Sequence, residues 1–420
     1  MKNQILFLIL LSLYCISCNN ETEQQSETIH KFKISEIDSL LKRYHELNRF
    51  SGVVLISNKE SNLYNKSFGF ANYEVKKPFT DSTAFKIGEI SELVTSRIIN
   101  EMAANGDFQL SDEVSKYLPE MKTELTIADL LNHKTNFPDI ATIQKQYPNL
   151  KYSTIEYANL AQVNSNKPGK SDLNFNILGL LIEKVSRKSF QENIFDYAKR
   201  LSLKDTYFQK TASTQEATGY LFYNFRGNGL ELQESPVYSL EAAFSSRGIK
   251  SSANDLAKII YSKPDINAEI DGYLSNDGFS YSIFYRADNG IAIIVLSNRR
   301  HPVAKEISNA INNILKGISY KVPLRRNPKA INPEILSNYI GKYKLNEFVK
   351  FEVIKEDDSL FVLLGPNKVA LIPQSENQFY MLESDASMRF EEDSTNKVNS
   401  VVLLNGFIKS DERALKIDYY

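Results

Sequence analysis

Apolar positions recur along this chain with two periods, which separate predicted helices from predicted strands. Spacings of three and four residues predict helices at 37–44, 91–104, 127–131, 178–185 and 253–261. Shorter apolar or alternating runs predict strands at 52–56, 63–70, 279–285 and 291–297. Because neighbouring strands are joined by short polar turns, we expect an α/β domain of the α+β type. An antiparallel sheet flanked by helices should form its centre.

A different pattern follows a basic, proline-containing stretch at 321–333, which we interpret as a linker. Short apolar segments separated by turn residues predict strands at 339–343, 351–354, 360–364, 369–372, 379–382, 388–390 and 401–404. Short strands in such a series are typical of a small all-β barrel or sandwich. We therefore expect a first domain at 34–320 and a C-terminal β domain at 334–420.

The first residues carry the features of a bacterial export signal. Lys2 is followed by an apolar run from Ile5 to Leu13, and Ser17 precedes Cys18. The run is too short for a stable membrane span. We expect a signal peptide at 1–17, a lipid on Cys18 and a polar tether at 18–33, which together would anchor the chain to a membrane of the bacterial envelope. The alternative is a buried N-terminal helix.

Charge and cysteine content narrow the classes of function. Lys and Arg total 50 and Asp and Glu total 51, so no large basic field favours nucleic acid as a partner. Both cysteines, Cys15 and Cys18, lie in the signal region, so the rest of the chain has no thiolate for catalysis or metal binding. The four histidines are widely spaced. We therefore expect no metal site and no cofactor.

Several phrases in the first domain occur in a recognisable order. They include FSGVVLIS, FKIGEIS, LSDEVSKYLPEM, TIADLLNHKTNFPD, ILGLLIEKVSRKSF and IKSSANDLAK. Together they resemble the β-lactamase-related serine hydrolases, which include class C β-lactamases and D-alanyl-D-alanine carboxypeptidases. The tail also resembles the β domain that often follows. The resemblance implies a β-lactamase/transpeptidase-like fold and, in active members, hydrolysis of peptide, ester or lactam bonds.

The three motifs that the resemblance makes catalytic are not intact in this chain. A serine and a lysine three residues later would fall at Glu89 and Glu92, and Ser91 has Val94 in place of the lysine. The tyrosine and asparagine of the second motif would fall at Lys170 and Asp172. The His/Lys-x-Gly strand would fall at Gly272, Tyr273 and Leu274, in a region that also looks shortened. Loss of a catalytic serine or its base costs about a million-fold in turnover in a comparable hydrolase.

Three interpretations of these changes remain open. The first is a pseudoenzyme of the envelope with a binding or scaffolding role, for which a cell-wall peptide or a protein is the candidate partner. The second is an active hydrolase that uses rearranged residues. The third is a structural surface protein with a filled pocket. Ligand, oligomeric state and membrane leaflet are not predicted.

The new charges can themselves be explained in three ways. Glu89 and Glu92 could act as an acid pair or hold a hard cation, but carboxylates in a first helical turn are favoured by the helix dipole alone. Alternatively, Lys170 pairs with these glutamates and keeps the old pocket closed. His133 is predicted to cap or pack after a helix.

Overall fold

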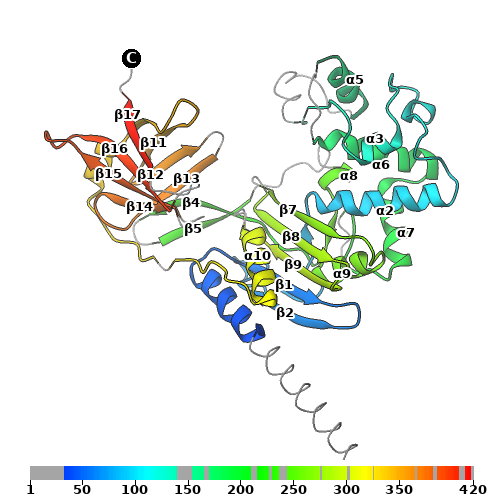
Figure 1. Cartoon of the computed structure of the whole chain (residues 1–420), viewed down its shortest axis with the longest axis horizontal. Coiled ribbons are helices and arrows are strands. Elements are labelled where there is room, and N and C mark those ends of the chain that lie inside the picture. The colour runs from blue at the N-terminus through cyan, green and yellow to red at the C-terminus, as the bar shows by residue number, and fades with distance from the viewer. Residues whose placement is uncertain are drawn as a thin grey trace, which may run out of the picture.

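The computed structural model describes residues 33–138, 140, 154–164, 170–209, 215–226, 229–235, 244–274, 277–299, 303–324, 326–364, 367–381, 386–405 and 412–417. Its first domain contains a five-stranded antiparallel sheet and helices on both faces, and its second is an eight-stranded closed barrel (Figure 1). The predicted α+β class and C-terminal β domain are therefore confirmed. The signal and Cys18 lie outside the described residues.

The five-stranded sheet has the strand order β2-β1-β9-β8-β7. The central strands are β1 (Gly52–Ser57), β8 (Phe279–Arg286) and β9 (Ile291–Ser297), and the edges are β2 (Asn62–Phe68) and β7 (Ala268–Leu274). Successive residues of β1 and β9 are buried on opposite faces, so the sheet is covered on both sides.

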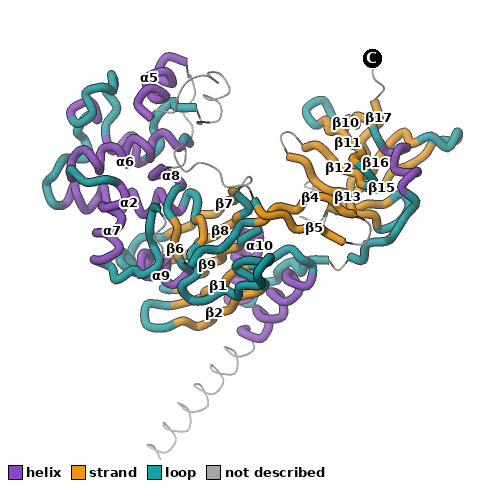
Figure 2. The backbone as a smooth tube through the Cα atoms, turned by 180° about the vertical axis from the view of Figure 1, so that it is seen from behind, coloured by secondary structure: helices purple, strands orange, loops and turns teal. Residues whose placement is uncertain are grey.

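Each face of the sheet packs on its own set of helices (Figure 2). One apolar core joins the sheet to helix 33–46 and α10 (Val303–Lys316). The larger core joins the opposite face to α2 (Ile90–Ala104), α3 (Ile127–Leu131), α6 (Asp172–Ser186), α7 (Phe190–Arg200) and α9 (Ala253–Tyr261). Smaller elements complete the domain: β3 (Phe85–Lys86), η1 (Val114–Lys116), α5 (Thr154–Asn164), α8 (Phe244–Arg247) and β6 (Lys250–Ser251).

A two-stranded ribbon links the two domains in space. It consists of β4 (Tyr220–Arg226) and β5 (Gly229–Glu234), which pair antiparallel. Figure 1 shows the ribbon extending from the first domain, and β4 contacts β12 and β13 of the barrel. The barrel is thus held by the ribbon as well as by the chain that leads into it.

The barrel runs in sequence order from β10 to β17, and β17 pairs with β10 to close it. Its strands are β10 (Gly341–Lys344), β11 (Lys350–Glu356), β12 (Ser359–Leu364), β13 (Asn367–Pro373), β14 (Gln378–Met381), β15 (Ser387–Glu392), β16 (Val398–Leu404) and β17 (Glu412–Ile417). A 3₁₀ helix, η2 (Pro333–Tyr339), precedes them.

Several element predictions need correction. The strand expected at 339–343 begins only at Gly341, because Asn332 caps η2 and Pro333 starts it. The helix expected at 178–185 begins six residues earlier, where the Ser171 side chain accepts the Leu173 N–H. Strand β17 and helix α7 were not predicted. For α7 a signal existed, since Ser189 and Glu192 form a capping box.

Candidate functional site: a charged cluster at the start of α2

The first turn of α2 carries the two glutamates that stand in the expected catalytic positions. Glu89 immediately precedes the helix, and the Glu92 side chain lies in its first turn, with Glu92 only 8% exposed. Ser91 is fully buried, and its hydroxyl accepts the Ile249 N–H at 3.1 Å. Ser91 is therefore inaccessible as a nucleophile. The positive end of the helix dipole favours both carboxylates at this position.

Lys170 reaches the glutamates from the residue pair before α6. Its Nζ donates to Glu89 Oε2 at 2.5 Å and lies 3.7 Å from Glu92 Oε2. The predicted contact of Lys170 with the glutamates is confirmed. Burial lowers the pKa of Lys170, but the hydrogen bond to Glu89 and the charges of Glu92 and Glu89 outweigh it, so the net pKa is raised. Lys170 is therefore a stable cation here.

Arg247, from α8, is a member of the cluster that no sequence pattern indicated. Its Nη2 donates to Glu89 Oε1 at 3.2 Å. Its Nε lies 2.9 Å from Asp172 Oδ1 and forms an ion pair with it. Burial raises the pKa of Asp172, and the charges of Glu92 and Glu89 add to that effect while Arg247 opposes it. Arg247 thus ties the α2 carboxylate to the start of α6.

His133 follows α3 as predicted, and it also contacts the cluster. Its Nε2 lies 3.4 Å from Glu92 Oε2, and its ring packs against Phe175 at 5.2 Å between centroids. Thr135 Oγ1 donates to Asn174 Oδ1 at 2.8 Å, which leaves the Asn174 amide N–H to face His133 Nδ1 at 3.1 Å. This arrangement makes Nδ1 an acceptor and directs the Nε2 proton toward Glu92.

The edge strand β7 brings the third predicted motif to the same place. Gly272 pairs with Tyr281 of β8, and a Cβ atom on Gly272 would lie 2.5 Å from the Tyr281 hydroxyl oxygen. Gly88 gives room on the other side of that ring. The Tyr281 hydroxyl accepts the backbone N–H of Glu89 at 3.0 Å. The Tyr281 hydroxyl is therefore bound to the Glu89 N–H, the backbone donor at the head of α2. The sequence did not indicate Tyr281 as a member of the site.

The other two residues of the third motif lie apart from this contact. Tyr273 alternates with Gly272 along β7 and is 45% exposed, whereas Leu274 belongs to the large apolar core. The region before β8, which we expected to be shortened, contains a full edge strand, because β7 pairs with β8 over seven residues. The structure thus brings together five of the expected site residues, Glu89, Glu92, Lys170, Asp172 and Gly272. Tyr273 and Leu274 lie on β7 apart from this cluster.

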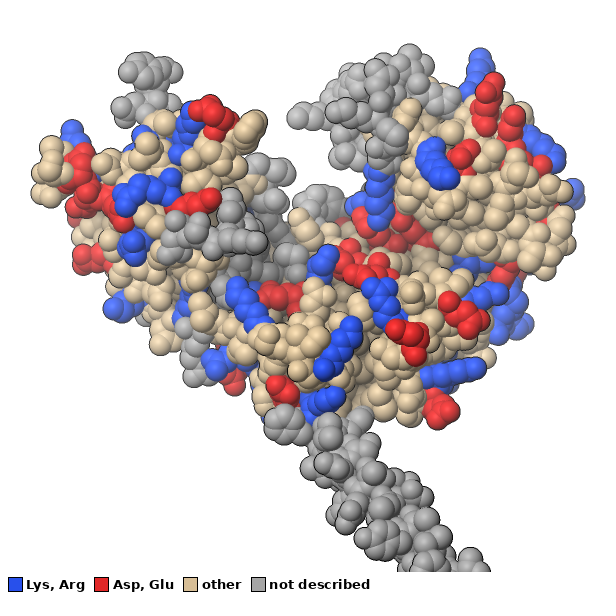
Figure 3. All heavy atoms as spheres, viewed as in Figure 1, with Lys and Arg blue, Asp and Glu red and all other residues tan. Residues whose placement is uncertain are grey.

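The chemistry available to this cluster is that of charge and hydrogen bonding. Acidic side chains gather where α2 begins, at the edge of the hollow beside the barrel, with basic side chains next to them (Figure 3). The Tyr281 phenol, which contacts the Glu89 N–H, has its pKa raised by burial. Among the described residues, no group of three His, Cys, Asp or Glu has the arrangement of a metal site.

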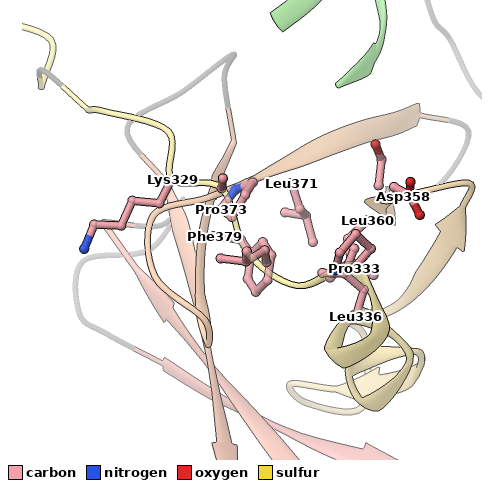
Figure 4. A pocket seen from close by; sticks show the side chains of 11 residues that line it. Lys329, Pro333, Leu336, Asp358, Leu360, Leu371, Pro373 and Phe379 are labelled. Carbon is pink, nitrogen blue, oxygen red and sulfur yellow. The ribbon is translucent and has the colours of Figure 1, made fainter. Parts of the chain in front are cut away.

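The barrel contains a second hollow of a different kind. A cavity of about 120 Å³ lies beside η2 and is lined mainly by apolar side chains such as Leu336, Leu360, Leu371 and Phe379 (Figure 4). Lys329 and Asp358 are placed at its periphery. Cavities of this size accept only a small apolar group. None of the described helices is both long enough and apolar enough to cross a bilayer.

Comparison with known proteins identifies both domains. A family model described as Beta-lactamase matches residues 37–270, and a domain of unknown function, DUF3471, matches residues 325–414. Penicillin-binding protein 4* of Bacillus subtilis is 24% identical over 85% of this chain and 94% of its own length. Protein flp of Staphylococcus aureus is 26% identical, over 44% of this chain and 41% of its own length.

Solved structures support the same fold. The octameric penicillin-binding protein homologue from Pyrococcus abyssi matches with a TM-score of 0.55 and 21% identity, over 91% of this chain and 100% of that one. A class C β-lactamase matches with a TM-score of 0.56 and 16% identity, over 69% of this chain and 99% of that one. Since the Beta-lactamase model spans more than half of the 420 residues, from helix 33–46 to β7, this chain belongs to the β-lactamase family.

Proposed function

We propose that this member of the β-lactamase family is a pseudoenzyme with a binding or scaffolding role. The observation that carries the proposal is the ion-paired first turn of α2, where Glu89 meets both Lys170 and Arg247. A carboxylate held by two cations is a poor nucleophile, and the nearby serine is buried. The Tyr281 hydroxyl on the Glu89 N–H also takes the donor that would otherwise stabilise an oxyanion.

The test is covalent labelling of the full chain with a fluorescent penicillin and with a fluorophosphonate. The Bacillus subtilis penicillin-binding protein 4* provides a positive control. We expect no labelling of the wild-type chain. Labelling that is lost in Glu89→Gln but kept in Glu101→Gln, a glutamate at the other end of α2, would overturn the proposal in favour of an active hydrolase with rearranged residues.

A series of gain-of-function variants tests whether the rest of the site can still support reaction with penicillin. Glu89→Ser with Glu92→Lys restores the serine and lysine, and Lys170→Tyr then removes the cation that faces them. We expect penicillin labelling to appear first in the triple variant, because Lys170 would otherwise repel the new lysine. Circular dichroism of each variant checks that the fold is kept.

We further propose that the chain acts at a bacterial membrane through a lipid on Cys18, with a cell-wall peptide or an envelope protein as its partner. The supporting features are Lys2, the apolar run that ends at Leu13, and Ser17. Metabolic labelling with an alkyne fatty acid tests this directly. Wild type and Cys15→Ser should both be labelled and enter the detergent phase, whereas Cys18→Ser should do neither.

A further inference from the structure

We propose that the carboxylates at the start of α2 form a binding site for a primary ammonium group of a ligand, and that Lys170 occupies this site from within the chain. The inference rests on the proposed binding role and names the chemical class that is bound. It concerns the cluster of Glu89, Glu92 and Asp172 on one side and Lys170 and Arg247 on the other.

The first argument is an imbalance of partners. Arg247 directs its contacts to Glu89 Oε1 and Asp172 Oδ1. Glu92 is left with His133 and with Lys170 at 3.7 Å, a distance too long for a hydrogen bond. Glu92 is more than nine-tenths buried, and its Oε1 has no hydrogen-bond partner among the described residues. A buried carboxylate oxygen without a donor is costly, and since Lys170 and His133 both face Oε2, the Glu92 carboxylate is only partly satisfied in this state.

The second argument is that Lys170 can leave. Its side chain is 53% exposed, whereas the Glu92 side chain that it faces is 10% exposed. Moving Lys170 Nζ into water therefore uncovers Glu89 Oε2 and Glu92 Oε2, the two oxygens that it faces. Arg247 remains in place and keeps Glu89 and Asp172 oriented.

The third argument selects an ammonium group over other cations. A primary ammonium group has three N–H donors on one compact nitrogen. Because a ligand amine is not tethered to the backbone as the Lys170 amine is, it can donate to Glu89 Oε2 and Glu92 together. A quaternary ammonium has no N–H and relies on an aromatic cage. Of the rings at the head of α2, Tyr281 is already engaged with the Glu89 N–H and His133 directs Nε2 toward Glu92, so the described contacts do not form such a cage. The ligand is thus a molecule with an unblocked amine, such as a peptide with a lysine-like side chain.

The experiment is rescue of Lys170→Ala by an external amine. Thermal unfolding of the full chain is followed with n-butylammonium chloride and, at equal ionic strength, with tetramethylammonium chloride. We expect n-butylammonium alone to raise the Tm of Lys170→Ala, at concentrations about tenfold below those that affect wild type, because the tethered lysine competes at an effective concentration in the millimolar range.

Two further variants make the result decisive. Lys188→Ala removes an equally exposed lysine from its ion pair with Asp196, and should respond to n-butylammonium only at the concentrations that affect wild type. Lys170→Ala with Glu92→Gln should lose the response seen in Lys170→Ala. An n-butylammonium effect that survives Glu92→Gln, or that tetramethylammonium reproduces, would overturn the inference. Lys170→Met replaces Lys170→Ala if the latter does not fold.

The source of the amine is tested with a peptide-borne form. Nα-acetyl-lysine N-methylamide should act at lower concentration than n-butylammonium if the ligand is a peptide. Absence of any amine response would remove the ammonium site but leave the penicillin-labelling result unaffected, so the failure of this inference can be told apart from failure of the proposed function.

Discussion

The two sheets of this chain end in different ways. The five-stranded sheet is open, with β2 at one edge and β7 at the other, whereas the C-terminal strands close into a barrel through the β10–β17 pair. A closed barrel has no unpaired main-chain edge, and its function must come from its ends or outer surface. The open sheet instead places β7, its edge strand in the part of the chain that the structure describes, beside the head of α2.

The comparison shows why the charged cluster lies in the first domain. Within the described ranges, strand β7 pairs with β8 and with no second strand, and Gly272 on β7 leaves room for Tyr281 to reach α2. The other edge, β2, is tied to helix 33–46 through Asp38, which contacts Tyr64 and Lys66. Both edges are thus tied to a helix, since Lys305 of α10 pairs with Asp271 of β7 at 3.1 Å, but only the β7 edge also lies beside the charged groups at the start of α2.

The largest expected effect comes from breaking the barrel closure. Ala414 on β17 is fully buried in the barrel core, so Ala414→Asp would place an unpaired charge there. We expect a loss of about 3–5 kcal/mol in the free energy of unfolding of the barrel, because a buried charge without a partner is strongly destabilising. Urea unfolding followed by circular dichroism measures it.

The neighbouring residue provides the control for barrel closure. Leu415 is 59% exposed, and Leu415→Asp should cost less than about 0.5 kcal/mol. Equal losses for the two variants would mean that β17 does not close the barrel in solution.

The second effect concerns the cluster beside β7. Arg247→Met leaves Glu89 and Asp172 without their shared cation, and we expect a loss of about 1–2 kcal/mol, discounted because the Arg247 side chain is 37% exposed. Arg200→Met, which breaks an exposed pair with Glu101, should cost no more than about 0.5 kcal/mol. Chemical denaturation of both variants tests the difference, and identical midpoints would contradict it.

The smallest effect, at the β2 edge, is a dependence on pH. Burial raises the pKa of Asp38, but hydrogen bonds from Lys66, Lys42 and Tyr64 outweigh it and lower the pKa to about 2. Since the folded-state pKa lies below the unfolded value, Asp38 stabilises the fold above about pH 4, and this contribution is lost as the pH falls toward 2.

Asp38→Asn tests this pH dependence. Its urea midpoint should lie below that of wild type at pH 5, and the gap should narrow as the pH falls to 2. Asp196→Asn, an exposed ion-pair variant on α7, should show a much smaller gap at pH 5. A difference in urea midpoint between wild type and Asp38→Asn that stays constant from pH 5 to 2 would contradict this prediction. It would show that ionisation of the Asp38 carboxylate does not stabilise the fold.

Helices and strands were predictable from the sequence where the spacing of their buried apolar residues dominates. Strand β9 and helix α9 follow the period of their buried residues, and their predicted bounds agree with the structure. Strand β17 was missed because its charged and apolar residues, ERALKI, do not alternate, so only closure of the barrel reveals it. The helix predicted at 178–185 was shorter than α6, because the first turn of α6 carries polar residues that are buried only by tertiary packing.

The sequence alone determined the family resemblance, the division into two domains and the residues that stand in the expected catalytic positions. It determined these because apolar periodicity and residue identity are local properties. Only the tertiary structure showed that Lys170 contacts Glu89, that Arg247 and Tyr281 join them, and that Glu92 retains a buried oxygen without a donor. Such contacts join residues far apart in the chain, and their energies depend on distance and burial, which no spacing of residue types specifies.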